Sequence, residues 1–259
     1  MRQEQMIVTK QIEIAKNIYE MTLRGQLVEE MKEAGQFLHL KPNRTDLILR
    51  RPISLANIDS DNNECQIIYR ASGDGTKDLA QLKAQDSVDV LGPLGTGFGH
   101  DFIAEQDLVF VIGGGIGVPP LYQLGKELKE KNAKIIFMNG FANRSVMFYE
   151  REFSQLGTLM ISTDDGSYGI KGHVGQLIDQ AVSVYGKPKA VFSCGPIPLL
   201  KTVETKFNDI EHVYLSMEER MACGVGACYA CVCESKTEEN KTKKVCEDGP
   251  VFKNGEVRI

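Results

Sequence analysis

The feature that most constrains this chain is a cluster of cysteines near its C-terminal end. The stretch CGVGACYACVCESKTEENKTKKVC, residues 223–246, holds five of the seven cysteines in a chain of 259 residues. The N-terminal MRQEQMIVTKQ lacks the apolar core of a secretion signal, and no stretch approaches the roughly 18 apolar residues of a membrane span. We therefore expect a cytoplasmic protein without a membrane partner, in which clustered thiols more often bind a metal than form disulfides.

The spacing of these cysteines indicates the kind of metal centre. Cys223, Cys228 and Cys231 follow the pattern C-x4-C-x2-C, and Cys246 follows after fourteen residues. This arrangement is similar to that of plant-type ferredoxins, in which four thiolates hold a [2Fe–2S] cluster. The small residues 224–227 allow backbone N–H groups to approach the cluster sulfurs. A zinc site is the alternative, but zinc ribbons usually pair two short knuckles, and here the fourth cysteine stands alone.

The other cysteines do not extend this set. Cys233 is interpreted as structural, and Cys65 and Cys194 are most simply small buried hydrophobic residues. The polar residues 235–244 between the third and fourth ligands are typical of a solvated hairpin loop. A formal net charge of −5 argues against a nucleic-acid partner, because affinity for phosphate backbones comes mainly from clustered Lys and Arg.

The middle of the chain alternates between short apolar runs and stretches with helical periodicity. The apolar runs occupy 108–112, 134–138, 158–162, 190–193 and 212–216, and the helical stretches occupy 120–132, 145–156, 175–184 and 198–207. Five strands joined by four helical crossovers predict a parallel, doubly wound sheet. Such sheets bind ligands at the carboxyl ends of their strands.

A glycine-rich turn, residues 113–117, ends the first of these predicted strands and precedes a helix that begins with the prolines at 119–120. Free N–H groups and the positive end of that helix can face a pyrophosphate. The turn is not G-x-G-x-x-G, because Val118 occupies the place of the third glycine. A tight turn without a ligand therefore stays the alternative. The turns at 163–169 and 194–196 end the third and fourth strands at the same edge.

The first hundred residues show short alternating segments separated by turns, the pattern of an antiparallel barrel. These segments occupy 5–14, 19–25, 37–40, 47–54, 65–70 and 87–92. Arg51 and Ser54 place a guanidinium and a hydroxyl three residues apart, which suits contact with a phosphate. The turn 73–76 opens a predicted helix over 76–85 and is a second candidate anion site. Each feature alone is more often a plain strand end or a helix cap.

The order of several motifs resembles that of the ferredoxin-NADP reductase superfamily. RRPISLAN, LGPLGTGF, GGGIGVPPL, TDDGSYG, CGP and MEERMACGVGACYACVC are together similar to the electron-transfer subunits of B-type, NAD-dependent dihydroorotate dehydrogenase. The resemblance covers essentially the whole chain, and the cysteine tail is its most specific part. It implies a β barrel plus α/β architecture. An antiparallel Greek-key FAD barrel is expected in residues 1–101, a parallel doubly wound NAD domain in 102–210, and a small [2Fe–2S] module in 211–259.

The resemblance also implies which residues bind the cofactors FAD and NAD. Arg51 would contact the FAD pyrophosphate, and Ser54 the flavin or its ribityl chain, while the superfamily usually carries an aromatic residue where this chain has Ile53. Arg144 could in principle meet the 2′-phosphate of NADP, and only the resemblance favours NAD. The other expected FAD residues are Pro52, Ile68, Arg70, Gly73, Gly75 and Thr76, and the expected NAD residues are Gly113, Gly114, Gly115, Gly117, Asp164, Cys194, Gly195 and Pro196.

The role implied by the resemblance is electron transfer in pyrimidine biosynthesis. In that family a separate catalytic subunit oxidises dihydroorotate at an FMN, and electrons pass through the cluster and FAD to NAD+. A barrel enzyme of that kind needs roughly 250 residues of its own, for which a chain of 259 residues has no room. We expect a heterotetramer of two subunits of each kind, with no catalytic acid–base residue in this chain. The alternatives are a reductase subunit serving a hydrogenase or a ferredoxin, and a non-enzymatic iron–sulfur redox sensor.

Overall fold

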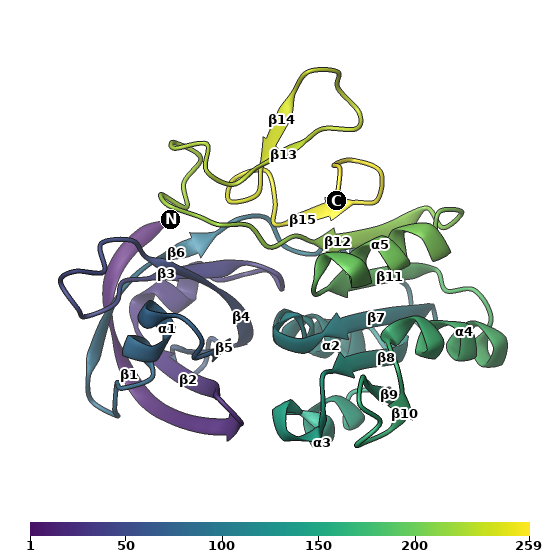
Figure 1. The fold of residues 1–259 in the computed structure, drawn as a ribbon, viewed down its shortest axis with the longest axis horizontal. Helices are drawn as coiled ribbons and strands as arrows, with labels where there is room; N and C mark the ends of the chain where they lie inside the picture. Colours follow the sequence, from purple (N-terminus) through teal and green to yellow (C-terminus); the bar gives the residue numbers. More distant parts are fainter.

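A computed structural model describes residues 1–259 and shows an N-terminal barrel beside a sheet flanked by helices (Figure 1). A small C-terminal cap lies over the boundary between them. None of the helices is both long enough and apolar enough to cross a bilayer.

The barrel has six strands that close in the order β1-β2-β5-β4-β3-β6, with every neighbouring pair antiparallel. The predicted antiparallel barrel is therefore confirmed. Alternate residues of each strand point inward, and the interior is filled by a cluster of buried apolar side chains that includes Leu38, Leu40 and Tyr69. The strands are β1 (Arg2–Ala15), β2 (Ile18–Arg24), β3 (Phe37–Leu40), β4 (Arg51–Asp59), β5 (Glu64–Arg70) and β6 (Ser87–Leu94).

Two predicted segments of the barrel differ from the structure. The strand expected over 47–54 begins only at Arg51: Ile48 is 80% exposed, and the side chain of Arg50 forms an ion pair with Asp89 of β6 at 3.0 Å. The helix expected over 76–85 is the single-turn α1 (Asp74–Leu79). Beyond it the chain turns back, and Gln85 donates its backbone N–H to Val8 of β1.

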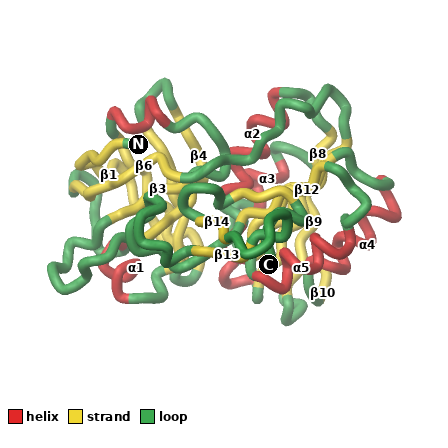
Figure 2. Tube along the Cα trace, turned by 90° about the horizontal axis from the view of Figure 1, so that it is seen from above, coloured by secondary structure: helices red, strands yellow, loops and turns green.

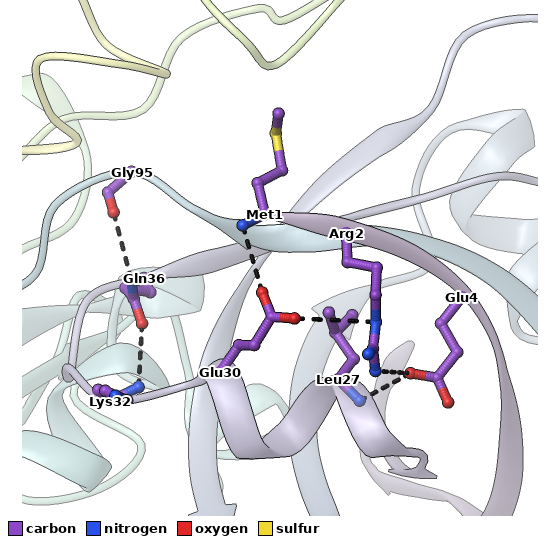
Figure 3. Close-up of polar contacts among 8 residues, drawn as sticks. All are labelled: Met1, Arg2, Glu4, Leu27, Glu30, Lys32, Gln36 and Gly95. Carbon is purple, nitrogen blue, oxygen red and sulfur yellow. Dashed lines mark hydrogen bonds and ion pairs between the residues drawn. The ribbon is translucent and has the colours of Figure 1, made fainter.

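One end of the barrel is covered by the 3-10 helix η1 (Gln26–Glu30), which polar contacts fasten to β1 (Figure 3). The carboxylate of Glu4 accepts the backbone N–H of Leu27 at 2.7 Å and pairs with Arg2 at 3.1 Å. The N-terminal ammonium of Met1 pairs with Glu30 at 3.2 Å. These contacts hold η1 so that its buried Leu27 side chain joins the barrel core.

The second sheet contains the five predicted parallel strands, in the order β9-β8-β7-β11-β12. The short strand β10 extends one edge in parallel, and β15 pairs with β12 antiparallel at the other edge. The chain reverses direction across the sheet between β7 and β11, which makes the carboxyl ends of these two strands the switch point where such folds bind ligands. The strands are β7 (Leu108–Gly114), β8 (Lys134–Phe141), β9 (Thr158–Thr163), β10 (Ile170–Lys171), β11 (Ala190–Cys194), β12 (His212–Ser216) and β15 (Val251–Lys253).

Helices cover both faces of this sheet. Leu121 of α2 (Pro120–Glu130) and Phe153 of α3 (Glu150–Ser154) pack in one core cluster with Val109 and Val111 of β7. Residues of α4 (Val174–Tyr185) and α5 (Ile197–Lys206) pack in another with the alternate β7 residues Phe110 and Ile112. The helix expected over 145–156 is replaced by the 3-10 turn η3 (Arg144–Val146) and the short α3, because Tyr149 between them adopts a left-handed φ of 59°.

The barrel is fixed against the sheet through α2 and α3. The side chain of Gln123 accepts the backbone N–H of Ile58 in β4 at 3.0 Å, and Lys126 donates to Asn57 at 2.6 Å. Tyr149 donates its hydroxyl to Glu20 of β2 at 2.5 Å. Bonds from two helical segments to two barrel strands fix the relative placement of the two parts.

The cap is formed by the segment after β12. Its hairpin, β13 (Val232–Glu234) paired with β14 (Thr242–Lys244), agrees with the hairpin predicted around residues 235–244. Viewed from above, this hairpin lies over the boundary between the barrel and the sheet (Figure 2). The chain then returns to the large sheet as β15. The cap thus begins after β12 and is joined to the large sheet again through its edge strand β15.

Candidate cofactor sites

A cavity of about 990 Å³ lies between the barrel and the carboxyl ends of β11 and β12. Its barrel side includes the run Arg51 to Ser54 at the start of β4, and its sheet side includes Cys194 and Ser216, which end β11 and β12. The expected cofactor residues that line it are Arg51, Pro52, Ile53, Ser54, Ile68, Arg70, Thr76, Gly117, Cys194, Gly195 and Pro196.

A second cavity, of about 420 Å³, opens at the switch point of the sheet. Among the expected residues it adds Gly114, Gly115 and Asp164 to the lining. The carboxylate of Asp164 lies 3.1 Å from Nδ1 of His173 on the rim of this cavity. The two cavities adjoin, because six residues line both: Arg70, Ile116, Gly117, Gly195, Pro196 and Glu218. Two ligands bound in them would meet at this shared wall.

The glycine turn has the form that close approach of a ligand requires. β7 continues through Gly114, residues 115–117 form a 3-10 turn, and α2 begins at Pro120. A Cβ atom at Gly117 would lie 2.5 Å from the carbonyl oxygen of Cys194, so only glycine lets the turn pack against the end of β11. The backbone is thereby exposed to both cavities at once.

Three of the expected glycines lie outside the cavity linings. Gly113 lies beneath the turn, where a Cβ atom would be 2.8 Å from the side chain of Val118. Gly75 lies under the guanidinium of Arg51, and a Cβ atom there would be 2.2 Å from Nε. Gly73 caps the start of α1, where its N–H donates to Thr76 Oγ1 at 3.2 Å. Gly75 therefore contributes by leaving room for Arg51.

Unpaired positive charge marks the larger cavity. The guanidinium of Arg51 donates only to backbone carbonyls, that of Leu49 at 2.6 Å among them, and the guanidinium groups of Arg70 and Arg220 form neither a hydrogen bond nor an ion pair. Guanidinium groups without a carboxylate partner beside a cavity of this size are suited to a phosphate-bearing ligand. The chain therefore offers three free cations to an anionic cofactor.

Sequence reasoning missed the wall formed by Ser216 to Met221 and by Pro250. These residues follow β12 or precede β15, and the resemblance includes MEER in the cysteine-tail motif without placing it among the cofactor-binding residues. One signal was available, because residues directly after the last parallel strand must lie at the ligand-binding edge. Among the residues of this wall, only Glu218 lines both cavities.

Cys194 is a neutral thiol in this site. Burial raises its pKa to about 12, although a hydrogen bond with Ser216 opposes the shift. At neutral pH the group therefore lacks the thiolate that a nucleophile needs. It acts as a small apolar wall residue, as expected from the sequence.

Arg144 is directed away from the second cavity. Its guanidinium lies over the ring of Tyr168, 5.4 Å from the ring centre, and it does not line the cavity. Its backbone N–H donates to Ser167 at 2.8 Å. The side chain considered as a partner for a 2′-phosphate thus does not line the cavity.

The four expected cluster ligands gather in the cap as two contacting pairs. The side chain of Cys223 interacts with that of Cys228, and that of Cys246 with that of Cys231. Two thiol pairs fit a two-iron cluster, in which each iron takes two protein sulfurs, better than a single zinc ion.

Backbone N–H groups point at these sulfurs. Sγ of Cys223 accepts N–H groups from Val225 and Cys228, each at 3.4 Å, and Sγ of Cys246 accepts that of Gly226 at 3.2 Å. Gly224 and Gly226 have left-handed φ angles of 73° and 75°, which turn the loop around the sulfurs. Such donors stabilise negative charge on thiolates and cluster sulfurs.

In the protein without its cluster, Cys223 is expected to be the thiol that reacts first. Burial raises its pKa, but the N–H groups of Val225 and Cys228 outweigh this effect and lower it from 9.0 to about 7. The thiolate, which is the reactive form, is therefore present above about pH 7. Alkylation of Cys223 by iodoacetamide, followed by mass spectrometry, should reach half its maximal rate near pH 7. Cys65, whose pKa burial raises, should stay unmodified, and a midpoint for Cys223 near pH 9 would contradict the assignment.

The remaining cap cysteine has a structural position. Cys233 lies in β13, partly buried against the core that also holds Cys231 and Cys246, and its thiol donates to the carbonyl of Lys243 at 3.6 Å. It lies outside the two pairs that hold the candidate cluster. Cys65 is fully buried in the barrel.

Comparison with known proteins agrees with this geometry. Residues 218–258 match the family model described as the iron-sulfur cluster binding domain of dihydroorotate dehydrogenase B. The electron transfer subunit of dihydroorotate dehydrogenase B (NAD(+)) from Enterococcus faecalis (strain ATCC 700802 / V583) is 48% identical over 258 residues, which cover 99% of this chain and 98% of that protein. The corresponding subunit from Geobacillus sp. (strain WCH70) is 50% identical over 259 residues, 99% of each chain.

Solved structures share the fold. The NADH-dependent reduced ferredoxin-NADP oxidoreductase superposes with a TM-score of 0.86 at 24% identity, over 98% of this chain and 90% of that one. The ferredoxin reductase of carbazole 1,9a-dioxygenase gives 0.71 at 15% identity, over 83% and 68%. These structural similarities confirm the barrel and the doubly wound sheet. The identity of 48% and 50% to bacterial relatives over almost the whole chain identifies one family of proteins. The chain belongs to the family of electron transfer subunits of NAD-dependent dihydroorotate dehydrogenase B.

Proposed function

We propose that this chain passes electrons from the FMN of a dihydroorotate-oxidising catalytic subunit to NAD+, in pyrimidine biosynthesis. The observation that carries the proposal is the proximity of three candidate cofactor sites. The two cavities share six wall residues, and Phe37, which lines the larger cavity, belongs to the same apolar core as Cys231 and Cys246 of the cap. One chain thus brings together sites for a flavin, a nicotinamide and an iron–sulfur cluster.

FAD fits the larger cavity. Its pyrophosphate is assigned to Arg51, with Gly75 leaving room for the guanidinium, and its flavin to the run that ends at Ser54. Arg70 stands at the wall shared with the smaller cavity. The volume of about 990 Å³ lies at the upper end of the range for ligand sites, as a dinucleotide requires. Ile53 is assigned the packing place that an aromatic residue holds elsewhere in the superfamily.

NAD fits the smaller cavity. The turn at Gly114, Gly115 and Gly117 offers its backbone and the start of α2 to the pyrophosphate. Gly195 and Pro196 face the wall shared with the flavin, and Cys194 lies behind them in the larger cavity. The nicotinamide would therefore meet the flavin at the switch point.

The cluster is assigned to Cys223, Cys228, Cys231 and Cys246. When bound, FAD exchanges electron pairs with NAD and single electrons with a [2Fe–2S] cluster, which is chemistry that the cofactors supply themselves. The chain's own residues bind, orient and shield the cofactors. With Cys194 neutral, no side chain of this chain is assigned as a catalytic acid, base or nucleophile.

The chain requires a catalytic partner, as the name of its family states. We assign FMN to that partner and a heterotetramer of two subunits of each kind to the complex. The units proposed within this chain are the barrel, 1–101, the NAD-binding part, 102–210, and the cluster module, 211–259, of which β12 and β15 also belong to the sheet. All seven cysteines are free thiols, which favours the reducing cytoplasm.

Reconstitution tests this function. The purified chain and its catalytic subunit should each fail to form NADH from dihydroorotate and NAD+, whereas the mixture should form it. Light scattering should give the mass of two subunits of each kind. Turnover of dihydroorotate by the isolated chain would contradict the proposal, because it would place the substrate site here.

Asp164 is expected to help the site reject NADP. Its carboxylate lies on the wall of the smaller cavity, where a 2′-phosphate would meet a like charge, while the 2′-hydroxyl of NAD can donate to it. Asp164→Asn should raise the efficiency with NADPH relative to NADH by about tenfold, the effect of about 1.4 kcal/mol of repulsion. Steady-state diaphorase rates with both nucleotides measure the ratio.

A matched control for that variant lies in the same turn. Asp165 does not line the cavity, and its carboxylate accepts the N–H of Ser167 at 2.9 Å. Asp165→Asn should leave the preference unchanged. If both variants shifted the ratio equally, the effect would come from the overall charge of the turn, and Asp164 would have no special role.

A further inference from the structure

His39 lies where the barrel meets the cysteine cap. In β3 the side chains of Leu38 and Leu40 belong to the barrel interior, so the alternate residues Phe37 and His39 point outward. Phe37 packs in the same apolar cluster as Cys231 of the cap. His39 is fully buried, with 0% of its surface exposed.

A histidine is unusual in this apolar contact between the barrel and the cap. Neither ring nitrogen has a hydrogen bond of normal geometry, and the polar group that interacts with the ring is the backbone of Cys223. An aliphatic side chain would fill the same space without burying two unpaired polar atoms. Packing alone therefore does not account for a histidine here.

The cluster-binding loop closes directly on this ring. Gly224 has a φ of 73°, and a Cβ atom there would lie 2.6 Å from Nδ1 of His39 and 3.0 Å from Cε1. The residue before it, Cys223, is the cluster ligand whose sulfur accepts two backbone N–H groups. The backbone of His39 is held from the barrel side, where Arg50 donates to the carbonyl oxygen of His39 at 3.2 Å. The imidazole of His39 thus faces the backbone next to Cys223, the first of the four expected cluster ligands.

We propose that His39 is a positioning residue for the [2Fe–2S] cluster: its ring fixes the backbone of Cys223 and Gly224 against the barrel and presents an N–H group to that loop. This inference rests on the proposed function, since it requires a cluster on the four cysteines. An N–H dipole directed at the loop stabilises the extra negative charge of the reduced cluster and so raises its reduction potential. Because β3 also supplies Phe37 to the larger cavity, the same strand supports both redox sites.

The test is a redox titration of the complex with its catalytic subunit, in which the cluster is followed by electron paramagnetic resonance. His39→Leu removes the N–H group and keeps an apolar filling. We expect the equilibrium constant for cluster reduction to fall about tenfold, which is a shift of about 59 mV to more negative potential for one electron. His39→Gln, which keeps an N–H donor, should recover at least half of that shift. FAD content and flavin potential should stay unchanged in both variants.

A control variant and a further substitution separate a specific effect of His39 from general damage to the protein. Leu91 pairs with His39 across β3 and β6 and packs on the same cap, so Leu91→Val should leave the cluster potential unchanged. If His39→Leu loses its iron altogether, a His39→Gln protein that keeps both the iron and the native cluster potential supports the proposal. Loss of iron from both His39 variants, while Leu91→Val keeps its iron, contradicts it. Gly224→Ala pushes the loop from the ring and should shift the potential in the same direction as His39→Leu.

An unchanged cluster potential and resonance spectrum in His39→Leu would overturn the inference, as would an equal shift of the flavin couple. Those results would leave the proposed function standing. Absence of iron from the unmodified complex would instead contradict the proposed function itself.

Discussion

Cys228→Ala is expected to remove the cluster and leave FAD bound. Cys228 is the exposed member of the four ligands, whereas Cys231 and Cys246 are buried in the core that joins the cap to the barrel. Its loss therefore takes away one thiolate without opening a cavity. Since even second-shell changes cost 10–100-fold in metal sites, losing a ligand should lower dihydroorotate-dependent NADH formation in the complex by at least about 100-fold.

Iron analysis, FAD analysis and the visible spectrum of the purified variant measure this outcome. The matched control is Cys233→Ala. It removes another cysteine of the cap, one that lies outside the two thiol pairs, and the variant should keep its iron. Full iron content in Cys228→Ala would contradict the ligand assignment. Loss of FAD together with iron would show that the barrel and the cap depend on each other to fold.

Arg51→Ala is expected to weaken FAD binding by about 10–100-fold, since hydrogen bonds to charged groups contribute roughly 1.5–3 kcal/mol. The guanidinium has no carboxylate partner, lines the larger cavity and rests on Gly75. Its removal should leave the barrel intact, because the side chain makes no contribution to the buried core. The dissociation constant, from recovery of flavin fluorescence on dilution, measures the effect.

Arg24→Ala is the control for that change. Arg24 is also a barrel arginine, but it pairs with Glu64 at 2.8 Å on the surface and lines neither cavity. Its loss should change FAD affinity less than twofold, as is usual for surface ion pairs of small net contribution. If the Arg51→Ala protein kept its native affinity for FAD, the assignment of the pyrophosphate to Arg51 would be wrong, and the pyrophosphate would bind elsewhere in the cavity.

The sequence predicted the regular elements well where hydrophobic pattern and strand length agree. All five parallel strands were found, because buried runs such as 108–112 are continuous and end at glycines or turns. The barrel was found from two-residue alternation. The cluster ligands could be proposed because their spacing is local, so that no knowledge of the fold was needed.

Elements whose ends depend on tertiary contacts were predicted less well. The periodicity over 145–156 continues across Tyr149, but the hydroxyl of that residue bonds to Glu20 in the barrel and its backbone is left-handed. Similarly, the helix from Asp74 ends after one turn because the following chain pairs with β1. Contacts between distant segments, which no local pattern records, decided both.

The walls of the cavities show the same limit. Glu218 and Pro250 reach the larger cavity only because β12 and β15 pair at the edge of the sheet. The choice between a dihydroorotate dehydrogenase subunit and a reductase serving another enzyme also lay beyond single motifs, since reductases of other systems share the fold. Identity over the whole chain to named relatives decided it.

The central claim is that one chain carries a nicotinamide site, a flavin and a [2Fe–2S] cluster in electronic contact. It is tested most directly by anaerobic titration of the purified chain with NADH and then NADPH, with the visible spectrum recorded after each addition. The account predicts that NADH bleaches both the flavin and the iron–sulfur bands, while NADPH has little effect at the same concentration. A coloured protein that neither nucleotide reduces would contradict the electron-transfer account.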